Sequence, residues 1–407
     1  MDGLIIGIDL CDSYTQISCA GQEESWTFPA VICKNNKIEE WYVGEAAYRH
    51  TLEGEGIIVD KLLNLVRRDG TATLTGTKYQ GIDLLCHYIQ KLLEIPKDRY
   101  PGQEIEQIVV TLPQIDAKLM EALLYCVDSV GIPRTSVCVV SHAESFIYYV
   151  LSQKKEVWNN QVALFDLSEE YLCYYEMKVQ RGLRQTMIFA ESEKLEEGFD
   201  LNILNTPSGV RLADKLLCSC GERLLEKKLF SSVFLTGKGF RSQDWAGEFM
   251  KLICARRRVY AEEAVFAKAA VYKALDCIGD KTSYPFIMIC DGRLDTAVSI
   301  KVTHKGEESQ LVLAAVGDRW YESKSTTEFI LDHQNYLEFT VSPTDLKNRR
   351  LVRLTLDGFP ERMEKTVKIR MNIEFLDEHT MSVTVRDLGF GELFPATDAL
   401  VRQEVML

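Results

Sequence analysis

Two apolar runs, one near the start of the chain and one near residue 162, share a single pattern of hydrophobic and polar positions. The sequence LIIGIDLCDSYTQIS starts at Leu4, and the sequence VALFDLSEEYLCYYEM starts at Val162. In both, the apolar run ends in Asp-Leu, a short polar turn follows, and a Tyr stands five residues after the Asp. Each copy predicts a buried strand that ends on a carboxylate, turns tightly and returns as a second strand.

The carboxylates of the two copies are Asp9 and Asp166, and the matching tyrosines are Tyr14 and Tyr171. In duplicated phosphotransferase folds, strand ends of this kind aim aspartates at a metal-bound phosphate. The repeat therefore predicts two similar lobes that face a cleft, with Asp9 and Asp166 as candidate catalytic and metal-binding residues. The structural alternative is that each Asp only caps its own turn.

Strand-like and helical patterns alternate through the first 283 residues, which is the order of an α/β domain. Strands are expected at the apolar runs 105–112, 136–140, 162–167 and 232–236. One helix is expected from Asp116, and another over 261–277, where Glu262 and Glu263 would face the positive end of the helix dipole.

Strict alternation replaces this order after residue 284. Every second residue from Ile369 to Phe375 is apolar, and the alternation resumes at Met381 after a polar turn, which predicts a hairpin with one buried face. The run LVLAAV, residues 311–316, is expected to be core. No helical pattern lies between residues 299 and 394, so an all-β sandwich is expected to follow the α/β domain.

The composition narrows the classes of function. A hydrophobic content of 46% over 407 residues is ample for the cores of two to three domains. The formal charge of -13 argues against a general nucleic-acid binder, which needs a basic surface. The arginine clusters at Arg256 and Arg349 are expected to be solvated surface.

Location is predicted from the same composition. The start of the chain has no basic leader, and no stretch reaches the apolar length of a membrane span, so no membrane insertion is expected. The twelve cysteines are scattered through apolar segments and match no zinc-site spacing. A reducing, cytoplasmic location is therefore predicted.

Several segments, in one order along nearly the whole chain, resemble the DnaK-type (seventy-kilodalton heat-shock) chaperones. IIGIDLCDSY and LFDLSEEY resemble the two phosphate loops of that family, VFLTGKGF resembles its adenosine loop, and FLDEHTMSVTVRDLGFGE resembles core strands of its peptide-binding sandwich. The resemblance implies a shortened member with an actin-like (ribonuclease H-like) two-lobe ATPase fold over 1–283. Lobe I would span about 1–157 and lobe II about 158–283, and a β-sandwich without a helical lid would span 284–407.

The resemblance also assigns candidate residues. Mg-ATP, if the site is retained, would be bound by Asp9, Asp12, Ser13, Tyr14, Asp166, Gly237 and Lys238. Asp9 and Asp166 would also be the candidate metal ligands, and Lys61 stands at the position of the family's catalytic lysine. The apolar segment 285–291 stands at the position of its interdomain linker.

Departures from the family pattern fall on the same site. Both phosphate loops lack the glycines that let backbone N–H groups approach an anion, with Cys11 and Asp12 in the first loop. An anion near Glu169 or Glu170 in the second loop would be repelled by about 4 kcal/mol per charge pair at ~4 Å. The family's acidic residue after strand 136–140 is replaced by His142, interpreted as an ordinary polar residue at a strand end.

One further departure is a deletion. Only about thirty residues separate Asp200 from Val233, where the family has a whole subdomain, and the segment 210–228 is expected to supply one helix.

These patterns predict a chaperone-like protein-binding or scaffold protein. Its ATPase domain would be degenerate and inactive, which makes it a pseudo-ATPase. It would take no cofactor, and its partner would be a protein or peptide rather than a nucleic acid. The alternative is an active ATP-binding chaperone, an ATP hydrolase whose reaction is coupled to peptide binding. A polymerising, actin-like cytoskeletal element is the third hypothesis, and the sandwich disfavours it.

Overall fold

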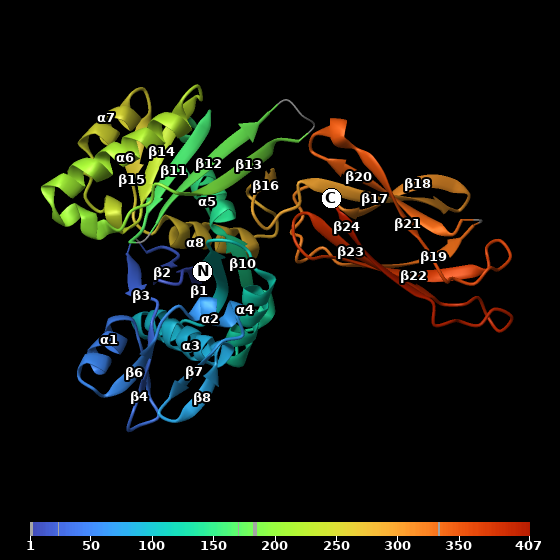
Figure 1. Cartoon of the computed structure of the whole chain (residues 1–407), viewed down its shortest axis with the longest axis horizontal. Helices are drawn as coiled ribbons and strands as arrows, with labels where there is room; N and C mark the ends of the chain where they lie inside the picture. The colour runs from blue at the N-terminus through green and yellow to red at the C-terminus, as the bar shows by residue number, and fades with distance from the viewer. Residues whose placement is uncertain (1–2, 23, 170, 182–184, 333) are drawn as a thin grey trace. The chain divides into compact units, whose positions relative to one another are not determined.

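The chain divides into two compact units, Met1–Phe286 and Ile287–Leu407, a boundary close to the one predicted at residue 283 (Figure 1). The computed structural model describes residues 3–22, 24–169, 171–181, 185–332 and 334–407. The first unit is α/β and the second is built from strands.

The first unit contains two mixed five-stranded arrangements with the same strand order. The first runs β10 (Val137–Ser141), β9 (Ile105–Leu112), β1 (Leu4–Leu10), β2 (Tyr14–Cys19) and β3 (Ser25–Pro29). The second runs β15 (Arg258–Ala261), β14 (Phe230–Thr236), β11 (Gln161–Leu167), β12 (Leu172–Gln180) and β13 (Met187–Leu195). In each, a central strand pairs parallel with one neighbour and antiparallel with the returning strand of its own hairpin. The four predicted strands are confirmed, each within two residues of its expected bounds.

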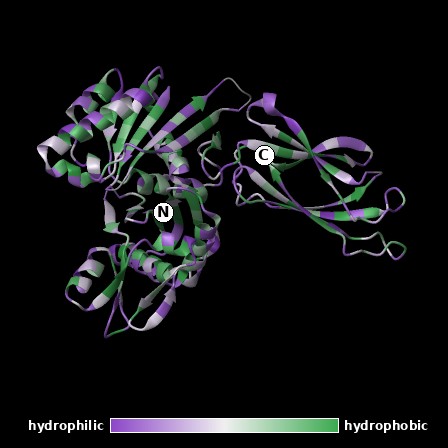
Figure 2. Cartoon of the chain, viewed as in Figure 1, coloured by the Kyte–Doolittle hydropathy of each residue, from purple (hydrophilic) through white to green (hydrophobic). Residues whose placement is uncertain are grey.

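The two predicted hairpins are confirmed as copies of one turn. The Cys11 N–H donates to the Tyr14 carbonyl at 3.0 Å, and the Ser168 N–H donates to the Tyr171 carbonyl at the same distance. Both central strands are almost wholly buried, and Figure 2 shows hydrophobic residues along the strands of both sheets. Each copy therefore brings a carboxylate to the end of a buried strand.

Two helices exchange places between the sheets. Helix α5 (His142–Leu151) follows the first sheet in sequence but packs on β12 and β13, and all of its residues are buried. Helix α8 (Val265–Ile278) follows the second sheet but packs on β1, β9 and α5. The two helices and the ends of the central strands therefore lie together in the middle of the unit (Figure 1).

The predicted start of the last helix was wrong. Ala261 is the last residue of β15, and α8 begins at Val265 after Ala264, whose backbone is left-handed with φ 55°. Glu262 and Glu263 therefore precede the helix and do not lie in its first turn. Glu262 forms an ion pair with Lys268 instead.

The remaining elements of the first unit lie around these sheets. They are β4 (Ile32–Asn35), β5 (Trp41–Val43), α1 (Gly44–Leu52), β6 (Gly56–Val59), α2 (Leu62–Arg67), β7 (Thr71–Leu74), β8 (Thr77–Gln80), α3 (Gly81–Arg99), α4 (Ala117–Ser129), α6 (Pro207–Leu225) and α7 (Gly247–Cys254). Helix α4 begins after Asp116 as predicted, and the Asp116 side chain accepts the Leu119 N–H. Helix α6 is the one helix expected in the shortened segment. None of the helices that the structure describes combines the length and the apolar character needed to cross a membrane.

The second unit pairs its strands into two antiparallel sheets after the short strand β16 (Ile287–Ile289). One sheet runs β18 (Glu307–Ala314), β17 (Thr296–His304), β20 (Tyr336–Pro343) and β21 (Arg350–Thr355), and the other runs β19 (Ser325–Leu331), β22 (Val367–Phe375), β23 (Thr380–Asp387) and β24 (Leu400–Met406). Among the described residues of this unit, the 3₁₀ turn Leu346–Asn348 is the one helical element.

The predicted hairpin of the second unit is confirmed, whereas the predicted core run is wrong in part. Strands β22 and β23 pair antiparallel, and Ile369, Phe375 and Met381 are buried. In the edge strand β18, Val312 is 61% exposed, because alternate residues of a strand point to opposite faces. An apolar run in an edge strand is not buried along its whole length.

The contact between β1 and α8 depends on Gly7, and this gives a first prediction. A Cβ on Gly7 would overlap the Ala267 carbonyl oxygen and lie 2.7 Å from the Val271 backbone nitrogen. Gly7→Ala should therefore lower the free energy of unfolding by about 2 kcal/mol or more, measured by urea unfolding. Gly247→Ala is the control, since nothing lies within 4 Å of its Cβ position; an equal loss there would contradict the assignment.

Candidate functional site

The carboxylates of the two hairpins are buried and incompletely satisfied. Asp9 is 0% exposed and Asp166 is 1% exposed. One oxygen of each, Oδ2, is buried without a hydrogen-bond partner. A buried polar atom without a partner costs about 1–3 kcal/mol, so this pair of oxygens requires an explanation.

His142 is the partner of Asp9. Its Nε2 lies 2.7 Å from Asp9 Oδ1, and its Nδ1 lies 3.2 Å from the Tyr175 hydroxyl. Because a carboxylate only accepts, we assign the hydrogen on Nε2 as the donor to Asp9. The imidazole also stacks on Phe266, with ring centroids 3.8 Å apart and planes 9° apart. Contacts on three sides therefore fix the orientation of the ring.

Two more groups from the first hairpin join this cluster. The Cys11 thiol donates to Asp9 Oδ1 at 3.5 Å. Burial, followed by the Asp9 charge, raises the pKa of Cys11 well above its usual value. The same two causes raise the pKa of Tyr14, so its phenol stays neutral. Glycine-bearing phosphate loops expose backbone N–H groups; this turn instead surrounds Asp9 with side chains.

Asp166 lies in a different environment from Asp9, although both end equivalent strands. Burial raises the pKa of Asp166 to about 7, an effect that His142 opposes and Asp9 strengthens. The protonated form of Asp166 is therefore favoured well above the usual pH range of a carboxyl group.

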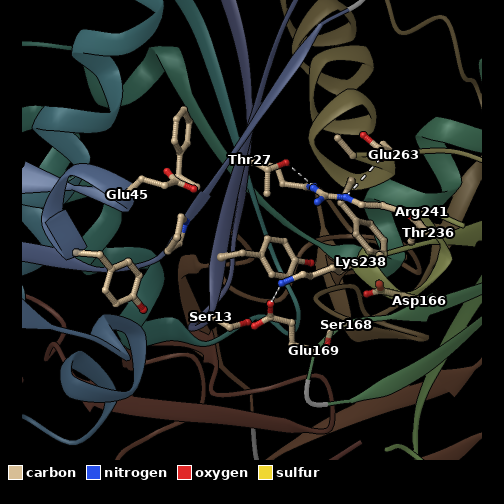
Figure 3. A pocket seen from close by; sticks show the side chains of 18 residues that line it. Ser13, Thr27, Glu45, Asp166, Ser168, Glu169, Thr236, Lys238, Arg241 and Glu263 are labelled. Atoms are coloured by element: carbon tan, nitrogen blue, oxygen red, sulfur yellow. Dashed lines mark hydrogen bonds and ion pairs between the residues drawn. The ribbon is translucent and has the colours of Figure 1, made fainter. Parts of the chain in front are cut away.

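A cavity of about 350 Å³ lies beside the second hairpin (Figure 3). It is lined by Ser13, Tyr14, Gln16, Thr27, Phe28, Pro29, Glu45, Tyr48, Asp166, Ser168, Glu169, Thr236, Gly237, Lys238, Arg241, Glu263, Ala264 and Phe266. Lys238 forms an ion pair with Glu169, and Arg241 Nε lies 3.5 Å from Glu263 Oε1. Among the described residues that line it, four are acidic and two are basic, and both basic side chains are already paired with carboxylates.

The backbone conformation and the close packing at position 237 of this cavity require a glycine. Its φ of 93° lies in the region that favours glycine, and a Cβ there would lie 2.6 Å from Asp166 Oδ1. The backbone thus approaches the second carboxylate closely.

The structure brings most, but not all, of the predicted site residues together. Ser13, Tyr14, Asp166, Gly237 and Lys238 line the cavity. Glu169, predicted to repel an anion, also lines it, but its charge is partly offset by Lys238. The other residue of that prediction, Glu170, lies outside the described residues.

Three predicted residues lie elsewhere. Asp9 lies within the buried cluster and does not line the cavity. Asp12 accepts the Asn64 N–H at 3.1 Å and lies 3.6 Å from Arg67, so it holds the first turn of α2. Lys61 is exposed just before α2 and is not one of the residues that line the cavity.

The sequence interpretation missed His142 and Cys11. His142 was interpreted as an ordinary polar residue, yet it is 1% exposed and bonded to Asp9. A signal existed: β1, β9 and β10 are parallel, so the carboxyl ends of β1 and β10 share one edge of the sheet. A residue directly after β10 therefore had to lie near Asp9.

Two family models match the chain, the first of them from residue 13 onward, so Asp9 and Cys11 lie just before the matched region. Residues 13–291 match a family described as "Family of unknown function (DUF5716) C-terminal". Residues 293–407 match a second family, described as "Domain of unknown function (DUF8552)". Among curated proteins, none matches the sequence.

The state of Asp166 gives a prediction on pH. Its pKa is raised from 3.8 to about 7 on folding, so its contribution to stability is fully present below pH ~4 and is lost as the pH rises through about 7. Between pH ~5 and ~8, wild type should lose about 3 kcal/mol more of its free energy of unfolding than Asp166→Asn, which cannot ionise. Urea unfolding in metal-free buffer at several pH values measures this. Parallel curves for the two proteins would show that Asp166 ionises normally.

Proposed function

We propose that this chain, which belongs to the DUF5716 family, is a chaperone-like protein-binding or scaffold protein whose actin-like domain does not hydrolyse ATP. Membership of the family by itself assigns no reaction. The repeated strand order and the exchanged helices support the actin-like comparison. The two sheets of the second unit support the comparison with a peptide-binding sandwich.

The burial of Asp9 carries the proposal of a pseudo-ATPase. A carboxylate that binds a metal-phosphate complex must reach the ligand, directly or through water. Asp9 is 0% exposed, and its Oδ1 is held by His142 at 2.7 Å. Opening this contact would leave a buried charge unpaired, at a cost of several kcal/mol.

The charges of the cavity support the same conclusion. A triphosphate needs unpaired cations or backbone donors, and here Lys238 and Arg241 are paired with Glu169 and Glu263. Glu45 and Asp166 add further acidic groups to the wall. An anion entering this cavity would break ion pairs before it gained any.

Binding of a protein partner is supported by the surface of the second unit. Among the described residues, nine of the eighteen large hydrophobic side chains that are exposed lie in Ile287–Leu407, which is less than a third of the chain. Leu393, 89% exposed, and Phe390, 41% exposed, belong to one loop before β24. Exposed apolar groups that gather in this way are typical of protein-binding surfaces.

The proposal includes the reducing, cytoplasmic location. All twelve cysteines lie in the described part of the chain, and no disulfide is assigned to them. Chains of this size in oxidising compartments commonly use disulfides.

An active ATPase is the second candidate, favoured by one observation. The cavity has the size of small-molecule sites, and Ser13, Asp166 and Gly237, three residues assigned to nucleotide binding, line it. This candidate requires Lys238 and Arg241 to leave their carboxylate partners when nucleotide enters.

Calorimetric titration of the full chain with Mg-ATP separates the two candidates. We expect no heat beyond dilution and no rise in the melting temperature, because the paired cations and the buried Asp9 give a triphosphate no favourable contact. Micromolar binding, or phosphate release that Asp166→Asn abolishes, would establish the ATPase instead.

The partner-binding surface has its own test. Fluorescence anisotropy with labelled, reduced and carboxymethylated α-lactalbumin, a permanently unfolded protein, should show binding to the full chain. The double change Phe390→Ser and Leu393→Ser should weaken it by about tenfold or more, since two apolar side chains lose their burial. Leu52→Ser is the matched control, because Leu52 is 87% exposed but belongs to the first unit. Equal binding by all three proteins would place the binding surface elsewhere.

A further inference from the structure

Three side chains with different ligand atoms gather at the end of β1. They are the carboxylate of Asp9, the thiol of Cys11 and the imidazole of His142, and all three are buried. Their ligand atoms lie within 4.8 Å of one another. Oxygen, sulfur and nitrogen donors in this combination match zinc, whereas magnesium and calcium prefer oxygen donors alone.

The imidazole is held as a metal-binding histidine usually is. Such a histidine has one ring nitrogen on the metal and the other on a hydrogen-bonding partner that fixes its orientation. Here Nδ1 lies 3.2 Å from the Tyr175 hydroxyl, which leaves Nε2 directed at Asp9. The stack on Phe266 fixes the ring plane, so little side-chain entropy remains to be lost on binding.

An unsatisfied oxygen points independently to a cation. Asp9 Oδ2, which belongs to one of the three side chains, is buried without a hydrogen-bond partner. A divalent cation would satisfy this acceptor, which no donor of the described chain reaches. With Asp9 and Cys11 ionised and His142 neutral, a zinc ion would also give a cluster of zero net charge, which is the least costly state to bury.

We propose that Asp9, Cys11 and His142 bind one zinc ion, with a water molecule as the fourth ligand. Binding replaces the Asp9–His142 hydrogen bond with ligand bonds and releases the Cys11 proton to solvent. The hydrogen of His142 moves from Nε2 to Nδ1, from which it is donated to the Tyr175 hydroxyl, so that Nε2 can bind the ion. The ion would connect the turn after β1 to the first residue of α5. The proposal does not depend on the function proposed above, since the three ligand residues are buried and lie outside the lining of the cavity.

The test begins with the full chain carrying Cys254→Ser and Cys277→Ser, which remove the two exposed thiols. This protein is stripped with a chelator, exposed to zinc and desalted, and its zinc is counted by plasma mass spectrometry. We expect one zinc per chain and a melting temperature that rises with free zinc. A chain that retains no stoichiometric zinc would overturn the proposal and leave the three residues as a hydrogen-bonded core.

Cobalt substitution then identifies the ligands. The cobalt-loaded protein should show a thiolate-to-cobalt absorption band, and Cys11→Ser should remove it and weaken zinc binding by about tenfold or more. Cys19→Ser, a change at another buried cysteine, and His50→Ala, a change in the more exposed His50, Glu53 and Glu55 group, should leave the band unchanged. A band that persists in Cys11→Ser would assign the metal elsewhere.

X-ray absorption of the zinc-loaded chain needs no change at the ligands and therefore cannot be defeated by misfolding of a variant. It should show one sulfur and otherwise nitrogen or oxygen neighbours. A spectrum with no sulfur, or with two or more, would contradict the assigned ligands.

Discussion

The fold buries the carboxylate of Asp9 at the end of the central strand of the first sheet, and the surrounding structure offsets the free-energy cost of removing this group from water. Desolvating such a charge costs several kcal/mol unless a partner with good geometry is present. His142 supplies that partner, and it is held in turn by Tyr175 from β12 and Phe266 from α8. Three contacts of His142, two polar and one aromatic, therefore join β1, α5, a strand of the second sheet and the helix that returns to the first sheet. The exchange of α5 and α8 is what brings these four elements together.

The two copies of the hairpin have kept one backbone and diverged in chemistry. Their turns are closed by the same hydrogen bond, yet Asp9 is bonded to a histidine, and Asp166 lies at a cavity wall with its pKa raised to about 7. Backbone geometry therefore accounts for the repeat, and side chains contributed by distant elements account for the difference. In the first copy the carboxylate is part of the buried core.

Local patterns predicted the strands and hairpins well because these elements depend on neighbouring residues. The repeated turns and the β22–β23 hairpin needed only alternation and apolar runs. The start of α8 was missed because Ala264 adopts a left-handed backbone that no local signal marks. His142 was missed because its partner, Asp9, is 133 residues away. Lys61 and Asp12 were placed by linear correspondence, whereas the chain uses that region to build α2.

The contacts of His142 also bear on motion between the two lobes predicted for the first unit. A nucleotide-driven fold closes its lobes over a ligand, so the contacts between lobes must change when the ligand binds. Here Asp9 and His142 belong to the sequence of the first predicted lobe, Tyr175 and Phe266 belong to that of the second, and all four side chains are buried. Separating His142 from Tyr175 and Phe266 would break a buried hydrogen bond and expose an aromatic stack, which opposes hinge motion. On the proposed function, the first unit would then act as a rigid body that supports a binding surface rather than as a ligand-driven switch.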